Sequence, residues 1–92
     1  MTIRDALDAE LTAALRRRDT AVVRAVRSAL TALPNAEAPR VPVTEAQQQA
    51  IVRTEIAELG SHAERLARLC RWDEADGVRR GMQTLARVLD DV

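Results

Sequence analysis

The sequence predicts an all-α protein, a compact four-helix array whose last two helices form an antiparallel hairpin. Larger apolar residues recur at steps of three and four along most of the chain, as they do on one face of a helix. No window alternates polar and apolar residues with the period of two that is typical of a strand. Three prolines lie within residues 34–43, and this stretch is therefore expected to be a loop between two helical pairs.

The first helix is expected over residues 3–18. Thr2, followed three residues later by Asp5, resembles a capping box, and Ile3 and Leu7 begin an apolar stripe. The following basic cluster contains neither Gly nor Pro, and one continuous helix through it is an alternative.

A second helix is expected over residues 20–33. Asp19 is a residue type that commonly caps a helix N-terminus, and Val22 and Val26 belong to a second apolar stripe. We therefore favour two helices over one in this half of the chain.

The third helix is expected over residues 45–71, after a capping box formed by Thr44 and Gln47. Its apolar positions step by four and three up to Cys70, which the pattern places in the core as a small inert residue. Gly60 allows an alternative in which the helix breaks there and restarts. The apolar pattern keeps its phase across Gly60, which favours a continuous helix.

The fourth helix is expected over residues 74–90, after a turn at residues 71–73 in which Asp73 serves as the N-cap. Gly77 and Gly81 lie four residues apart. No apolar run of membrane-spanning length surrounds them, so they are expected to allow a close approach to another helix.

Composition excludes several classes of function. The 92 residues suffice for one domain, residues 1–92, and the 14 basic residues, all arginine, balance 14 acidic ones. Without lysine, Schiff-base and P-loop lysine chemistry are absent. The single cysteine cannot form an internal disulfide, and no stretch approaches the ~18 apolar residues of a membrane span. The chain is therefore expected to be cytoplasmic, with no membrane association.

No catalytic, metal or cofactor site is predicted. The one possible nucleophile–base pair, Cys70 and His62, would lie roughly 12 Å apart along a helix. His62 follows Glu58 by four residues, but two ligands fall short of the three or four that zinc requires. We expect a solvated histidine. Whether the chain is an enzyme is left open by the sequence, although no catalytic residues are evident.

A cluster of arginines in the first helical pair is the candidate binding surface. An arginine guanidinium can donate paired hydrogen bonds to phosphate oxygens, so a nucleic acid is the candidate ligand. The alternative is that these arginines only solvate the surface, because residues 1–40 carry seven arginines against five acids and almost no aromatic side chain is available to stack on bases. The candidate nucleic-acid-binding residues are Arg16, Arg17, Arg18, Arg24 and Arg27.

Several segments resemble the YqeY-like family, the N-terminal helical half of the domain found in YqeY and GatB proteins. They are the basic cluster ending in Asp19, the run Val-Val-Arg-Ala-Val-Arg-Ser-Ala-Leu at residues 22–30, and Ile-Val-Arg-Thr-Glu-Ile at residues 51–56. At the turn Cys70-Arg71-Trp72-Asp73, Cys70 replaces the glycine that is usual in the family.

The resemblance implies an accessory role in tRNA-dependent amidation, a carbon–nitrogen ligase reaction with glutamine as amide donor. The implied partners are tRNA or amidotransferase subunits, and no small-molecule cofactor is implied.

Two other functions are alternatives. One is a homo-oligomeric protein-interaction module with no RNA role, since strict three-and-four stepping suits packing between chains as well as within one. The other is a small all-α enzyme similar to chorismate mutases, which bind a dicarboxylate through several arginines. That chemistry also calls for a lysine, which this chain lacks.

Overall fold

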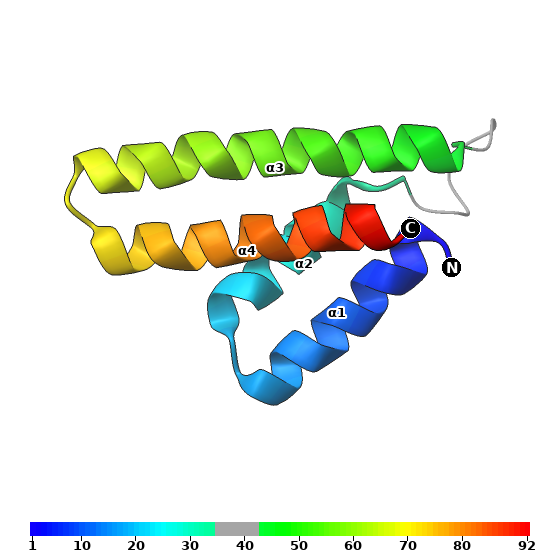
Figure 1. Cartoon of the computed structure of the whole chain (residues 1–92), viewed down its shortest axis with the longest axis horizontal. Coiled ribbons are helices and arrows are strands. Elements are labelled where there is room, and N and C mark those ends of the chain that lie inside the picture. Colours follow the sequence, from blue (N-terminus) through cyan, green and yellow to red (C-terminus); the bar gives the residue numbers. More distant parts are fainter. Residues whose placement is uncertain (35–42) are drawn as a thin grey trace.

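Four helices account for the regular structure of the residues that the computed structural model describes, 1–34 and 43–92. The helices are α1 (Ile3–Arg17), α2 (Thr20–Ala32), α3 (Glu45–Arg68) and α4 (Trp72–Asp91). In Figure 1, α3 and α4 lie side by side and antiparallel, and α1 lies on the opposite side of α4 from α3. The all-α fold with a C-terminal hairpin is confirmed. Most of the predicted proline-rich loop lies outside the described residues.

The first two helices are separate because Arg18 breaks the helical path between them. Its backbone adopts the left-handed conformation, with φ of 56°, and α1 ends at Arg17, one residue earlier than expected. The Asp19 side chain then accepts a hydrogen bond from the backbone N–H of Val22 and starts α2, as its position predicted. This α1–α2 corner positions several charged side chains that are described below.

The third helix is continuous through Gly60, as predicted, and begins with the complete capping box of Thr44 and Gln47. It ends at Arg68 rather than at the expected residue 71. The reason is that Cys70 is left-handed, with φ of 58°. In that conformation the amide of Arg71 donates to the carbonyl of Leu66, which closes the helix end.

The expectation that Cys70 is buried was therefore wrong. Cys70 lies outside α3 and its side chain is exposed. It occupies the position after a helix end where glycine is the most favourable residue.

The fourth helix begins at Trp72, two residues before the expected start. Arg71 is the N-cap residue and makes no side-chain capping hydrogen bond, so the prediction that Asp73 caps this helix was wrong. Asp73 and Glu74 lie in the first turn instead, where negative charge interacts favourably with the helix dipole. None of the described helices is both long enough and apolar enough to cross a membrane.

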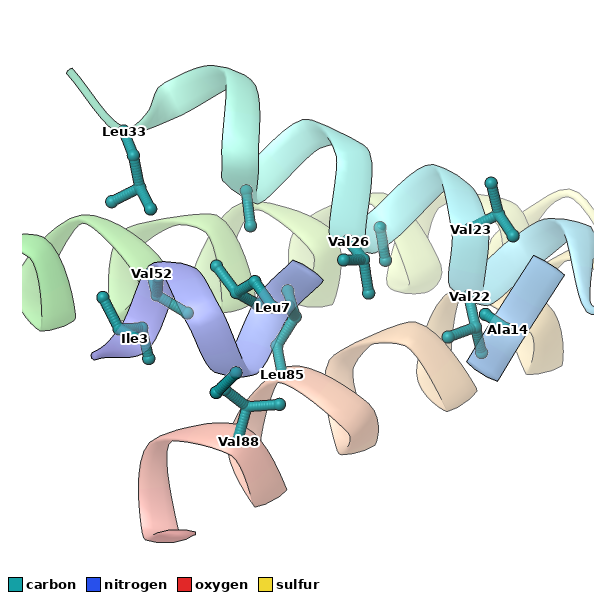
Figure 2. Packing of buried hydrophobic residues seen from close by; sticks show 13 residues of the cluster. Ile3, Leu7, Ala14, Val22, Val23, Val26, Leu33, Val52, Leu85 and Val88 are labelled. Carbon is teal, nitrogen blue, oxygen red and sulfur yellow. The ribbon is translucent and has the colours of Figure 1, made fainter. Parts of the chain in front are cut away.

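The core is built from aliphatic side chains that all four helices contribute. Figure 2 shows Leu7 of α1 between Val52 of α3 and Leu85 of α4, with Val22 and Val26 of α2 farther along the same layer. All five are fully or nearly fully buried. With no large aromatic side chain in the core, stability depends on close packing of small ones.

A close helix contact lies between α2 and α4, where small residues face each other. A Cβ atom added to Gly81 would lie 2.6 Å from the Cβ of Ala25, and one added to Gly77 would lie 3.0 Å from the Cβ of Ala21. Both glycines are buried. The predicted close helix approach is confirmed, and α2 is the helix that approaches.

We expect Gly81→Ala to destabilise the fold by about 1–2 kcal/mol, because the overlap with Ala25 outweighs the higher helix propensity of alanine. The control is Gly60→Ala, whose new methyl would meet only the flexible end of Met82, at 3.2 Å. This variant should be neutral or stabilised by up to ~1 kcal/mol. Urea denaturation measures both. Equal effects of the two substitutions would contradict the close packing.

We expect Cys70→Gly to stabilise the protein by about 0.5–1 kcal/mol, because glycine adopts a left-handed conformation without steric cost. Cys70→Ala, which keeps a Cβ atom, is the matched control and should leave the free energy of unfolding nearly unchanged. A destabilised Cys70→Gly variant in thermal or urea unfolding would show that Cys70 makes interactions beyond its backbone conformation.

Candidate functional site

An open cleft of about 1000 Å³ lies between α2, the C-terminal half of α3 and the first turns of α4. Its floor is apolar and its edges carry charge. The apolar part comprises Ala21, Ala25, Leu59, Leu66 and Val78, together with Gly77. Because Gly77 and Ala21 belong to the close α2–α4 contact, the crossing of these two helices also forms the floor of the cleft.

Three arginines form one end of the cleft, which we call the basic end. Arg17 and Arg18 come from the α1–α2 corner and Arg24 from α2. All three are exposed, and none makes an ion pair with any described residue. Their guanidinium groups are therefore available to an external anion.

The ion pair between Arg80 and Asp19 connects α4 to this corner, with Nη2 and Oδ1 3.4 Å apart. Asp19 is the less exposed partner, at 21% of its side chain against 53% for Arg80. Partial burial raises the pKa of Asp19. The hydrogen bonds from Arg80 and the Val22 amide, with the charges of Arg80 and Arg17, outweigh this and hold the pKa below its ordinary value. Asp19 is thus ionised at neutral pH and capable of capping α2 and fixing Arg80.

Two carboxylates also line the cleft. They belong to Asp73 and Glu74, in the first turn of α4. Glu74 accepts hydrogen bonds from Nε and Nη2 of Arg71, at 3.1 and 2.7 Å, whereas Asp73 makes no ion pair with a described residue. His62 of α3 also lines the cleft and is exposed, as expected of a solvated histidine.

The structure brings three of the five predicted binding residues, Arg17, Arg18 and Arg24, to this cleft. Arg16 and Arg27 are exposed but do not line it. The other cationic residue of the cleft, Arg80, is distant in sequence and was missed. Only the register of Gly77 and Gly81 against α2 could have indicated its position, because Arg80 lies one turn beyond Gly77.

A second, smaller hollow of about 360 Å³ lies beyond the Arg80–Asp19 pair and shares Arg17 with the cleft. Arg87 lines it and pairs with Glu10 of α1, at 2.7 Å. Arg80 and Arg87 of α4 are thus both paired with a carboxylate.

Among the described residues, no three His, Cys, Asp or Glu side chains gather as metal ligands. Cys70, the one candidate nucleophile, is exposed and does not line the cleft that contains His62.

In comparisons with known proteins, no family model, no curated protein and no solved structure matched this chain.

We expect Asp19→Asn to cost less than about 1 kcal/mol at neutral pH, because asparagine still caps α2 and the lost ion pair is exposed on the Arg80 side. Asp19→Ala, which also removes the cap, should cost about 1 kcal/mol more. Urea denaturation of both variants separates the contribution of the N-cap to the free energy of unfolding from the contribution of the Asp19 charge.

The charge contribution should depend on pH. The pKa of Asp19 is lower in the folded protein than in the unfolded chain. Ionisation of Asp19 therefore stabilises the fold at pH values above its ordinary pKa, and this stabilisation is lost as the pH falls through the pKa of the folded protein. The difference in free energy of unfolding between the wild type and Asp19→Asn should therefore become smaller at acidic pH. A difference that stays constant with pH would contradict the lowered pKa of Asp19 in the folded protein.

Proposed function

We propose that the chain is a non-catalytic helical binding module of the YqeY-like type, which contacts tRNA phosphates through the basic end of its cleft. In this role it serves as an accessory to tRNA-dependent amidation in the cytoplasm. The observation that carries the proposal is that Arg17, Arg18 and Arg24, from two helices and the corner between them, meet on one surface without ion-pair partners among the described residues.

Phosphate is the anion that this set of side chains suits best. Each guanidinium offers a planar set of N–H donors that matches phosphate oxygens, and several side by side match a chain of phosphates. Base stacking plays no part in the proposal, because the described residues that line the cleft include no aromatic side chain. Recognition is therefore expected to depend on charge and shape rather than on base identity.

Two carboxylates of the cleft limit where phosphates can bind. Asp73 and Glu74 repel phosphates from the start of α4. We therefore expect the phosphate chain to follow Arg24 and the α1–α2 corner with its Arg17 and Arg18, and not the α3–α4 turn.

The test is the binding of labelled bulk tRNA over a salt series to a variant carrying Arg17→Gln, Arg18→Gln and Arg24→Gln. We expect the affinity to fall about tenfold or more and the slope of log affinity against log salt to decrease by about two to three, since three phosphate contacts are lost.

The charge-matched control carries Arg53→Gln, Arg65→Gln and Arg68→Gln, three exposed arginines of α3 that do not line the cleft. It should bind nearly as wild type does. Equal losses in the two triple variants would show that binding follows net charge alone, and no binding at low salt would overturn the proposal.

A further inference from the structure

The cleft is a wedge between α2 and α3 whose shape follows from the way both helices lie on α4. Figure 1 shows α2 passing behind α4 toward α3. The two helices are joined where the Ser28 hydroxyl donates a hydrogen bond to Glu55, at 2.9 Å. Nearer its start, α2 rests on α4 instead, through Ala21 and Gly77. The cleft therefore ends at the Ser28–Glu55 hydrogen bond and opens toward the α1–α2 corner.

The floor of the cleft is an apolar surface that the proposed RNA contact leaves uncovered. Ala21 and Gly77 have no side chain long enough to fill the space between α2 and α3. Leu59 of α3 and Val78 of α4 line the same space and, like Ala21, remain partly exposed. A ligand that covers these side chains removes apolar surface from water, which favours its binding.

The size of the cleft suits a small molecule better than a polymer. Its volume of about 1000 Å³ is at the upper end of the roughly 300–1000 Å³ that is usual for small-molecule sites, which often lie between packed helices. Along α2 the lining runs from Thr20 to Ser28, which is about 12 Å of helix. A docked peptide helix needs a groove that is open at both ends, whereas the Ser28–Glu55 hydrogen bond closes this one.

The charge of the cleft selects an anion. Arg17, Arg18 and Arg24 make no ion pair with any described residue. Of the two carboxylates at the start of α4, Glu74 is paired with an arginine and Asp73 is not. In the described part of the chain, three unpaired guanidinium groups of the cleft thus stand against one unpaired carboxylate.

We infer that the cleft binds a small organic anion that carries an apolar body. The anionic group, a carboxylate, sulfonate or phosphate monoester, accepts hydrogen bonds from the three arginines. The apolar body lies on Ala21, Leu59 and Val78, where its burial adds to the affinity. An inorganic anion uses only the arginines and a neutral apolar molecule uses only the floor, so a ligand with both parts binds more tightly than either.

This inference goes beyond the proposed tRNA contact and does not rest on it. Both ligands use the same three arginines, so the small anion and tRNA are expected to compete.

The test uses two fluorescent probes that differ in one group. 8-Anilinonaphthalene-1-sulfonate carries a sulfonate on an apolar body, and N-phenyl-1-naphthylamine is the same body without the charge. We expect the wild type to bind one molecule of the sulfonate probe per chain, saturably, and to bind the neutral probe more weakly. We expect inorganic phosphate at the same concentration to displace the sulfonate probe only slightly.

Removing the arginines should affect the two probes differently. In the variant with Arg17→Gln, Arg18→Gln and Arg24→Gln, we expect the affinity for the sulfonate probe to fall about tenfold or more. The affinity for the neutral probe should change by less than about twofold, because the floor is intact. The matched control is the α3 triple variant described above, which should bind both probes as the wild type does.

Substitutions on α4 test the floor and the remaining carboxylate. Val78→Trp fills the cleft and should abolish binding of both probes, whereas Ala57→Trp, at an exposed position of α3 outside the cleft, should not. Asp73→Asn removes a negative charge from the cleft and should tighten binding of the sulfonate probe by about twofold. Circular dichroism checks that each variant is folded.

Nuclear Overhauser cross-peaks locate the bound probe on the wild type. We expect cross-peaks from the aromatic protons of the sulfonate probe to the methyl groups of Leu59 and Val78. Cross-peaks confined to Leu69 and Trp72, the exposed apolar residues of the α3–α4 turn, would place the probe elsewhere and overturn the inference.

The remaining outcomes separate this inference from the tRNA proposal. The inference fails if the sulfonate probe does not bind at millimolar concentration, if the two triple variants lose equal affinity, or if inorganic phosphate displaces the probe as well as the probe itself binds. If the probe binds as expected but tRNA does not bind at low salt, the small-anion site stands and the RNA role fails. If tRNA binds and the probe does not, the reverse holds.

Discussion

The close contact between α2 and α4 is the constraint on which the rest of the structure depends. Gly77 and Gly81 leave no side chain between the helices, so Ala21 and Ala25 rest directly on α4. A core of aliphatic side chains, many of them alanine and valine, with no large aromatic side chain can exclude water only if its helices lie this close. The same contact brings Asp19, at the start of α2, within reach of Arg80, one turn beyond Gly77.

The charged surface follows from that contact and from one backbone break. Arg18 turns the chain between α1 and α2, which places Arg17 and Arg18 at the edge of a cleft whose floor is the α2–α4 crossing. Neither the corner nor the crossing alone would assemble this surface. The RNA contact proposed above uses this surface.

Local signals in the sequence predicted most of the fold. Side-chain caps mark the starts of α1, α2 and α3, and the glycine pair predicted a close helix approach. The α3–α4 turn was predicted at residues 71–73 but lies at residues 69–71, because Cys70, at an apolar position of the periodic pattern, occupies a left-handed site where glycine would have been recognisable. The place of Arg80 in the cleft could not be predicted, because it depends on the register of α4 against α2.

The central claim is that α2 lies directly on α4 through these small residues. The most direct measurement is a nuclear Overhauser spectrum of the labelled protein, read for cross-peaks from the Ala21 and Ala25 methyl groups to the α-protons of Gly77 and Gly81. The structure predicts a strong cross-peak for each facing pair. Absence of both, with the Ala25 methyl in contact with other parts of α4 or with α3, would contradict the crossing and with it the cleft.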